Sequence, residues 1–178
     1  MKIPLEKIKA MILYFAFNTD PKFLGKTKLM KLFYFADFGY VKKHGVPMTF
    51  DKYKNMEHGP VPTTIYGLIS TAYSEPDESL LSDIVEFQEV NGMHKIIPRK
   101  EFTNTHRKML SVSELKFMAE VCQRFYDSNK RKIESASHLE YPWSSTEVLD
   151  DIPYTLATKD KDSETSEGEV ELAMRILE

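Results

Sequence analysis

The stretch from about Lys26 to His44 most constrains the fold, because almost no side of it is polar. One helical stripe of this stretch carries Leu29, Leu32, Phe33, Ala36 and Tyr40. Other apolar side chains fill much of the remaining circumference, and a helix that is apolar nearly all round must be buried on most sides. We therefore expect a helix here, at the centre of the fold, with the other elements packed around it.

Apolar residues at helical spacing predict further helices on both sides of this central one. The first opens at Pro4, and another begins after Pro62. A third follows residues 111–114, which spell a capping box, and a short one spans residues 133–139. The chain is therefore expected to be mainly helical.

The Asn91-Gly92 pair is the strongest strand signal in the chain, because both positions of a tight hairpin turn need positive φ. Residues 84–90 and 93–98 flank it and supply the two strands. Residues 48–57 are also rich in strand formers, although polar residues interrupt the pattern. The expected fold class is α+β, mainly α, with a small antiparallel sheet or hairpin against a helical core.

The charge of the chain divides near residue 147. The formal net charge is -3, but residues 147–178 hold ten acidic and three basic residues, a net of -7, which leaves +4 for the first 146. Residues 158–168 have almost no apolar side chain and are expected to be solvated or disordered. We therefore expect a domain over residues 1–150. An acidic, partly disordered tail over residues 151–178 follows it, with a short terminal helix that needs a surface to pack on.

A single cysteine and the short apolar runs bear on the compartment. Cys122 cannot close an intramolecular disulfide, and its apolar helical neighbours indicate an inert core thiol. The longest apolar run, residues 10–17, is far shorter than the roughly 20 residues of a membrane helix. We expect a cytoplasmic protein that does not interact with a membrane.

No nucleotide-binding or zinc-protease motif is present, and the five histidines lie at least a dozen residues apart. We therefore expect no catalytic, cofactor or metal site, and no enzymatic activity. The enzyme alternative is a metal-independent hydrolase that uses Asp37, Glu57 or His58. Neighbours on an extended segment point to opposite faces, which argues against joint catalysis by Glu57 and His58.

Polar residues within the central helix need a separate explanation. Asp37 interrupts an apolar stretch and is predicted to tie the helix to neighbouring backbone or to a basic side chain, with partner binding as the alternative. Lys28 and Lys31 share a helix face and are expected to form a solvated stripe. Since the excess positive charge of the domain is only +4, the expected partner is a protein rather than a nucleic acid. Self-association stays open.

Several segments together resemble the signature of a known family. They are the run from Lys28 to Asp37 (KLMKLFYFAD), then Gly45 and Tyr53, then residues 57–61 (EHGPV) and Tyr66. This series closely resembles the Panacea domain of the SocA-like antitoxins, which are related to phage-associated GepA proteins.

The resemblance is most specific over residues 26–66 and extends over roughly residues 5–150. His138 and Trp143 look like the closing pattern of the family. The acidic end of the chain falls outside the resemblance.

The resemblance implies a non-enzymatic antitoxin that neutralises a cognate toxin by direct protein contact, usually with the toxin encoded beside it. The alternative is a regulatory or proteolytic adaptor, associated with a phage or mobile element, that binds a host protein. Many relatives carry a further domain ahead of the Panacea domain, whereas this chain opens almost directly at the first helix.

The motif residues divide into structural and contact candidates. Those assigned a structural role are Lys28, Leu29, Leu32, Ala36, Asp37, Gly59, Pro60 and Val61. The polar or amphipathic ones are predicted partner contacts, because aromatic and polar-capable groups are enriched in binding hot spots. They are Tyr34, Asp37, Tyr53 and His58.

Overall fold

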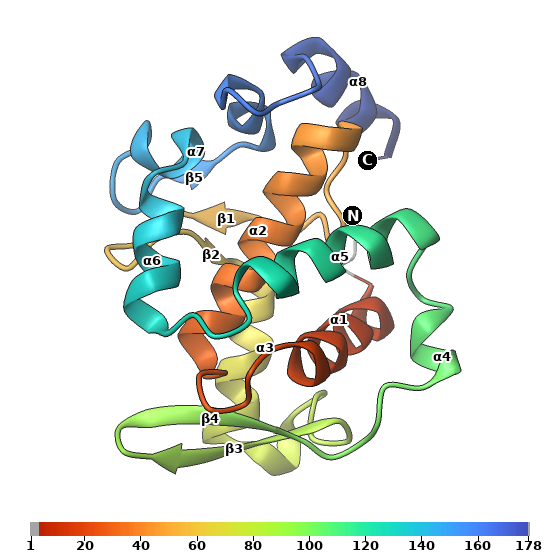
Figure 1. Cartoon of the computed structure of the whole chain (residues 1–178), viewed down its shortest axis with the longest axis vertical. Coiled ribbons are helices and arrows are strands. Elements are labelled where there is room, and N and C mark those ends of the chain that lie inside the picture. Colours follow the sequence, from red (N-terminus) through yellow and green to blue (C-terminus); the bar gives the residue numbers. More distant parts are fainter. Residues whose placement is uncertain (1–3, 178) are drawn as a thin grey trace.

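Helix α2 (Lys26–His44) runs through the middle of the molecule, and the other elements surround it (Figure 1). Every residue from Lys28 to Phe38 is buried, whichever side of the helix it lies on. Elements α1, α3, α5, α6, β2, β4 and η2 all contact this helix. The predicted central helix and the mainly helical α+β fold class are confirmed.

The computed structural model describes residues 4–177. The remaining α-helices are α1 (Leu5–Asn18), α3 (Thr63–Ser74), α4 (Asn104–Arg107), α5 (Val112–Arg124), α6 (Lys130–His138), α7 (Tyr141–Ser144) and α8 (Glu167–Leu177). Short 3-10 helices are η1 (Pro76–Glu78) and η2 (Tyr154–Lys159). The strands are β1 (Tyr53–Lys54), β2 (Val61–Pro62), β3 (Val85–Val90), β4 (Met93–Pro98) and β5 (Asp151–Ile152).

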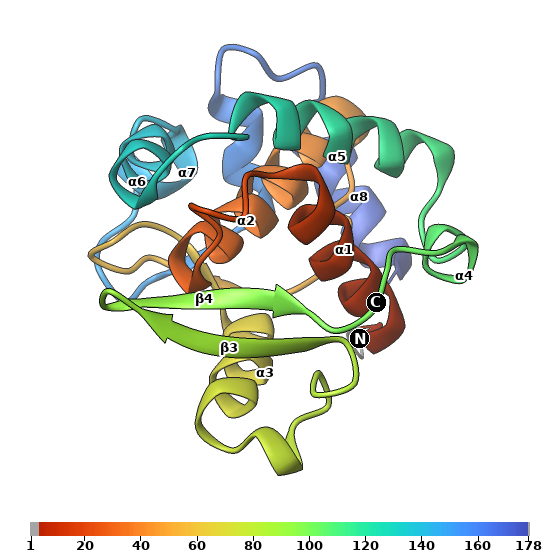
Figure 2. The same ribbon diagram turned by 60° about the horizontal axis from the view of Figure 1, so that its bottom comes forward.

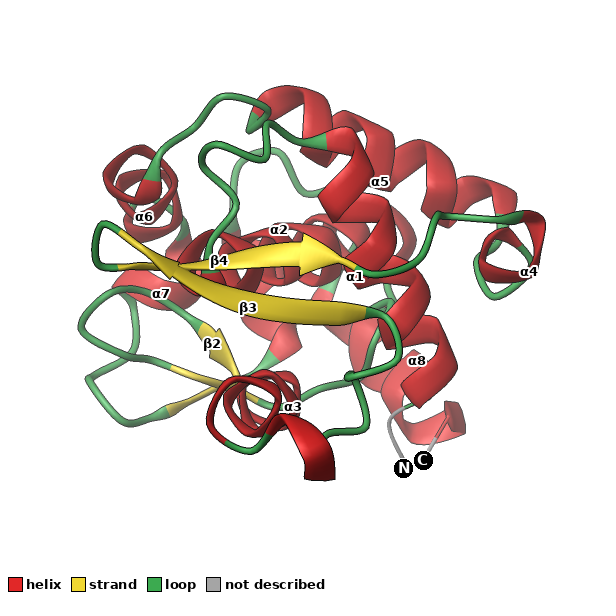
Figure 3. Ribbon diagram, turned by 90° about the horizontal axis from the view of Figure 1, so that it is seen from below, coloured by secondary structure: helices red, strands yellow, loops and turns green. Residues whose placement is uncertain are grey.

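The β3–β4 hairpin forms one layer of the fold. It lies between α3 on one side and α1 and α2 on the other (Figures 2 and 3). The strands pair antiparallel with Val90 opposite Met93, and both turn residues have positive φ, 52° at Asn91 and 74° at Gly92. The hairpin predicted from this Asn-Gly pair is therefore confirmed.

A second sheet has three short strands in the order β2-β1-β5. From the predicted strand over residues 48–57, only Tyr53 and Lys54 pair as strand. Residues 48–51 instead form a loop held by side-chain hydrogen bonds, because Met48 and Thr49 donate their backbone N–H groups to Asp37. Of the polar residues that interrupt the pattern, Lys54 lies in the strand, and Lys52 and Asn55 lie immediately on either side of it.

The segment 151–177 is folded against α2, which corrects the expectation of a partly disordered tail. Ile152 in β5 pairs with Tyr53 in β1. The N–H of Glu164 donates to the carbonyl of Lys42 at the last turn of α2 (2.8 Å). The polar residues of the tail are ordered because they satisfy carbonyls that the end of a helix leaves without partners.

The expected terminal helix is present as α8. Its residue Val170 is fully buried, and Met174 packs against the core, whereas Leu172 and Ile176 on another face are exposed. A helix of this length is marginal alone and is stabilised by such packing.

Lys42 links the tail to α2. Its ammonium lies 2.8 Å from Asp160, 3.2 Å from Asp162 and 3.3 Å from Glu140, and its side chain is 6% exposed. Burial lowers the pKa of Lys42, but the attraction of these carboxylates outweighs it and holds the pKa above the ordinary value. The lysine therefore compensates three acidic groups that would otherwise repel one another.

Replacing Lys42 by methionine is expected to release the tail. Without the ammonium, Glu140, Asp160 and Asp162 repel one another, so amide hydrogen exchange in residues 151–177 should accelerate by about tenfold or more. Lys43→Met is the matched control, because Lys43 is exposed and its one ion pair among residues 4–177 is with Glu120 on α5 (2.7 Å). Unchanged protection of β5 and α8 in Lys42→Met would contradict the assigned role.

Across residues 4–177, none of the helices is both long enough and apolar enough to cross a membrane.

Candidate partner-binding groove

The carboxylate of Asp37 ties α2 to the loop that leads into β1. Its Oδ1 accepts the backbone N–H groups of Met48 and Thr49, both at 2.8 Å. Its Oδ2 accepts the hydroxyls of Tyr53 (2.9 Å) and Thr49. This confirms the predicted tie to neighbouring backbone. Burial raises the pKa of Asp37 to about 6, although these hydrogen bonds favour the charged form.

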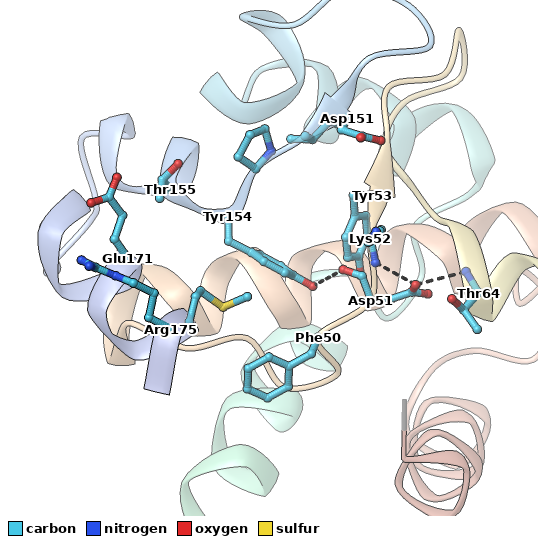
Figure 4. Close-up of a pocket in the computed structure, with 13 residues that line it drawn as sticks. Phe50, Asp51, Lys52, Tyr53, Thr64, Asp151, Tyr154, Thr155, Glu171 and Arg175 are labelled. Carbon is cyan, nitrogen blue, oxygen red and sulfur yellow. Dashed lines mark hydrogen bonds between the residues drawn. The ribbon is translucent and has the colours of Figure 1, made fainter. Parts of the chain in front are cut away.

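A second buried carboxylate, Asp51, holds the other end of the same loop. It accepts the N–H groups of Thr64 (3.1 Å) and Ile65 (2.8 Å), the free donors in the first turn of α3. Its carbonyl accepts the hydroxyl of Tyr154 from η2 at 2.7 Å (Figure 4). The sequence does not mark Asp51 as a cap, because it lies twelve residues before the start of α3 and local spacing cannot link the two.

The turn formed by residues 57–61 lies over Lys31. Gly59 has φ 95°, a conformation that favours glycine, and a Cβ atom there would lie 2.6 Å from Ser137 Oγ. The carbonyl of Pro60 accepts a hydrogen bond from the Lys31 ammonium at 2.8 Å. The structural role assigned to Gly59 and Pro60 thus includes direct contact with α2.

Lys28 and Lys31 are each only 1% exposed, which corrects the prediction of a solvated stripe. Their aliphatic stems lie in the core, and their ammonium groups donate to carbonyls, Lys28 to Tyr126 at 2.8 Å and Lys31 to Pro60. Burial lowers the pKa of Lys31 to about 7. The periodic pattern could not show this, because the carbonyls come from distant parts of the chain.

The closing residues of the motif pack back onto the same turn. His138 and Trp143 stack with ring centroids 3.8 Å apart and an interplanar angle of 12°. The indole N–H of Trp143 donates to the carbonyl of Met56 (3.1 Å). Residues far away in the sequence therefore hold the chain at Met56, immediately before the turn formed by residues 57–61.

Most of the predicted contact residues lie in the interior. Tyr34 and Asp37 are fully buried and Tyr53 is 1% exposed, so these three offer no accessible surface to a partner. His58 is on the surface, where its Nδ1 lies 3.9 Å from Glu134. Asp37 therefore shares no site with the exposed Glu57 and His58, the other two residues of the hydrolase alternative.

Cys122 is buried as predicted, and burial raises the pKa of its thiol to about 12. Within residues 4–177, no three side chains of the metal-binding types His, Cys, Asp and Glu are placed to hold an ion together.

A groove of about 510 Å³ opens beside this turn, between the start of α2 and the start of α3. Its lining, which we call the motif groove, consists of Lys26, Thr27, Met30, Lys31, Lys54, Met56, Glu57, His58, Val61, Thr63 and Tyr66. Tyr66 is 45% exposed and Met56 38%, so two large side chains present apolar surface here. The Lys26 ammonium lies over the Tyr66 ring, 4.1 Å from its centroid.

The profile of the family described as "Antitoxin SocA-like, Panacea domain" matches residues 29–144. The chain belongs to this SocA-like antitoxin family. No curated protein matches the chain, and no solved structure matches it. The matched residues of the Panacea domain include most of the motif groove, because all its lining residues except Lys26 and Thr27 lie between positions 29 and 66.

A second pocket of about 600 Å³ lies largely outside the matched residues, between the loop at residues 50–53, β5 and α8 (Figure 4). We call it the tail pocket. Phe50, which has an unusual φ of 59° for a non-glycine residue, forms one wall. Lys52, Tyr154 and Arg175 also line the tail pocket. The folded tail thus adds a surface to the Panacea domain of this chain.

Proposed function

We propose that the chain is a cytoplasmic antitoxin that neutralises a cognate toxin, encoded beside it, by direct protein contact at the motif groove. Membership of the SocA-like antitoxin family is the observation that carries this proposal. Neutralisation by such contact needs no catalytic step.

The position of the family motif supports the choice of surface. Its buried members Asp37 and Lys31 fix neighbouring loops by hydrogen bonds to Tyr53 and Pro60. Exposed members such as His58 and Tyr66 line the groove. Bonds to α2 and to Trp143 fix the turn before any partner arrives. A pre-organised surface loses less conformational entropy on binding, which favours affinity.

Co-expression with the product of the adjacent gene tests the proposal. We expect that product to arrest growth when it is expressed alone, and growth to recover when this chain is expressed with it. The two proteins should then co-purify as a complex. A neighbour that is harmless alone, or that still arrests growth in the presence of this chain, would refute the proposal.

Tyr66→Ala is expected to weaken the complex by about tenfold or more, because an exposed aromatic side chain in a groove is typical of a binding hot spot. Isothermal titration calorimetry of the purified partner with each variant measures the change in Kd. Tyr141→Ala is the control, since Tyr141 is 43% exposed on α7, outside the groove. Equal Kd values for wild type and Tyr66→Ala would remove the groove from the interface.

A regulatory or proteolytic adaptor is the second candidate, and the tail pocket favours it. An adaptor holds two proteins at once and so needs a second surface, which this pocket supplies. A pull-down separates the two proposals. An antitoxin should return the adjacent gene product alone, whereas an adaptor should also return a host protein. In the adaptor case, mutation of Phe50 should remove the host protein and leave the adjacent gene product bound.

A further inference from the structure

The motif groove adjoins a second hollow of about 470 Å³ at the start of α2, and Lys26 and Thr27 line both. We call the two together the basic groove. Five lysines and two histidines line it, against one acidic residue, Glu57. This surface lies wholly within residues 1–146, whose formal net charge is +4, and it carries much of that excess.

Three of these lysines have no acidic partner. Within residues 4–177, no carboxylate lies within 4 Å of the ammonium groups of Lys26, Lys28 and Lys31. Lys28 and Lys31 each donate a single hydrogen bond, to a backbone carbonyl, although an ammonium group has three donors. Carboxylates beyond that distance, Asp20 and Asp127 for Lys28 and Glu134 for Lys31, still attract these two groups, so what both lysines lack is a carboxylate in direct contact.

The backbone at the same place adds to the positive potential. Helix α2 begins at Lys26, and its N-cap residue is Gly25, which has no side chain to cap the free N–H groups. The N-terminus of a helix carries a partial positive charge. His94, whose buried Nδ1 has no hydrogen-bond partner among residues 4–177, lines the groove beside it.

Apolar side chains alternate with these charges. Met56 and Tyr66 form exposed walls at one end, and Phe23 and Met93 line the other. A nucleic acid would require a series of exposed cations that follows successive phosphates. Two of the five lysines are instead 1% exposed and lie beneath apolar walls, which is the arrangement expected for a polypeptide.

We propose that the basic groove binds an acidic segment of the toxin, in which an apolar side chain sits between Met56 and Tyr66 and neighbouring carboxylates approach Lys26 and the start of α2. This inference rests on the proposed antitoxin function and specifies the chemistry of its partner. Lys26, the partly exposed member of the three lysines, then acquires a carboxylate partner in the complex.

Zero-length cross-linking tests the contact directly. A carbodiimide joins a carboxylate to an amine without a spacer, so it reports only groups in contact. In the complex of the full chain with the adjacent gene product, we expect mass spectrometry to find Lys26 joined to an aspartate or glutamate of the partner. Cross-links confined to lysines outside the groove would overturn the inference while leaving the antitoxin function intact.

Charge-removing variants provide the second arm. Lys130, an exposed lysine at the start of α6, also lines the basic groove. Lys26→Gln combined with Lys130→Gln should raise Kd for the same partner by about tenfold or more at about 50 mM salt, and by less at about 0.5 M. The matched control combines Lys108→Gln and Lys116→Gln, two exposed lysines away from the groove, and should bind as wild type does. Equal Kd values for both double variants overturn the inference.

Two further outcomes are informative. If the wild-type chain forms no complex with the adjacent product, the proposed function fails and the inference fails with it. If a short duplex DNA or single-stranded RNA binds wild type, and the Lys26/Lys130 double variant loses that binding, the groove is a nucleic-acid site and the acidic-segment proposal is wrong.

Discussion

Replacing Asp37 by alanine is expected to lower the free energy of unfolding by about 3–5 kcal/mol. The carboxylate is fully buried and accepts two backbone N–H groups and the hydroxyls of Thr49 and Tyr53. Alanine leaves all these donors without an acceptor in the interior, where each unsatisfied group is costly. Urea unfolding followed by circular dichroism measures the loss.

Two variants keep this prediction decisive even if Asp37→Ala does not fold. Asp37→Asn retains one acceptor oxygen and should cost less, about 1–2 kcal/mol. Asp77→Ala, at an exposed carboxylate in η1, should leave stability unchanged. A loss below about 1 kcal/mol in Asp37→Ala would show that the network contributes little to stability.

The pH dependence of stability is a further readout of the same group. Burial raises the pKa of Asp37 to about 6 in the folded protein, so the folded state binds the proton more tightly than the unfolded state does. Its contribution is therefore fully present at low pH and is lost as the pH rises from about 4 through 6. Asp37→Asn should lack this component of the pH profile.

Replacing Gly59 by alanine is expected to cost about 2–4 kcal/mol, since it combines backbone strain with overpacking. The residue has φ 95°, and a Cβ atom would lie 2.6 Å from Ser137 Oγ and 2.9 Å from Lys31 Cε. Ser137 and Lys31 are both buried and have little room to move aside. Displacing Lys31 would also break its bond to Pro60 and distort the motif groove.

Gly92→Ala separates these two costs. Gly92 also has positive φ (74°), but apart from its chain neighbours no atom of the described residues 4–177 lies within 4 Å of the added Cβ, so only the strain of about 1 kcal/mol remains. Chemical denaturation of both variants gives the difference, which is the steric contribution at Gly59. Equal losses of unfolding free energy in the two variants would mean that the turn at Gly59 accommodates a side chain without displacing Lys31.

Local patterns in the sequence were sufficient for much of the fold. The apolar circumference of α2 required burial, the Asn91-Gly92 pair required a tight turn, and Ser111 and Glu114 form the capping box that their spacing predicts. These features depend on the intrinsic geometry of helices and turns, so neighbouring residues are enough to reveal them.

Local sequence patterns predicted the residues of the candidate site less well than they predicted the fold. The motif located Gly59, Pro60 and Tyr66, yet three of the four predicted contacts, Tyr34, Asp37 and Tyr53, proved to be buried. A polar side chain in a motif is compatible with either a surface contact or an internal hydrogen bond. Which of the two applies depends on whether distant backbone supplies partners, as Met48 and Thr49 do for Asp37.

The sequence by itself determined the central helix and the hairpin, because each depends on residues close together along the chain. It also determined membership of the antitoxin family, because that rests on residue types at set positions along residues 29–144 and not on their contacts. Only the tertiary structure decided that Lys28 and Lys31 are buried, that the acidic tail is folded and that the exposed motif residues share one groove. The physical reason is that burial and hydrogen bonding of a polar group depend on partners far away in sequence. Tyr126 and Pro60 are such partners for these two lysines.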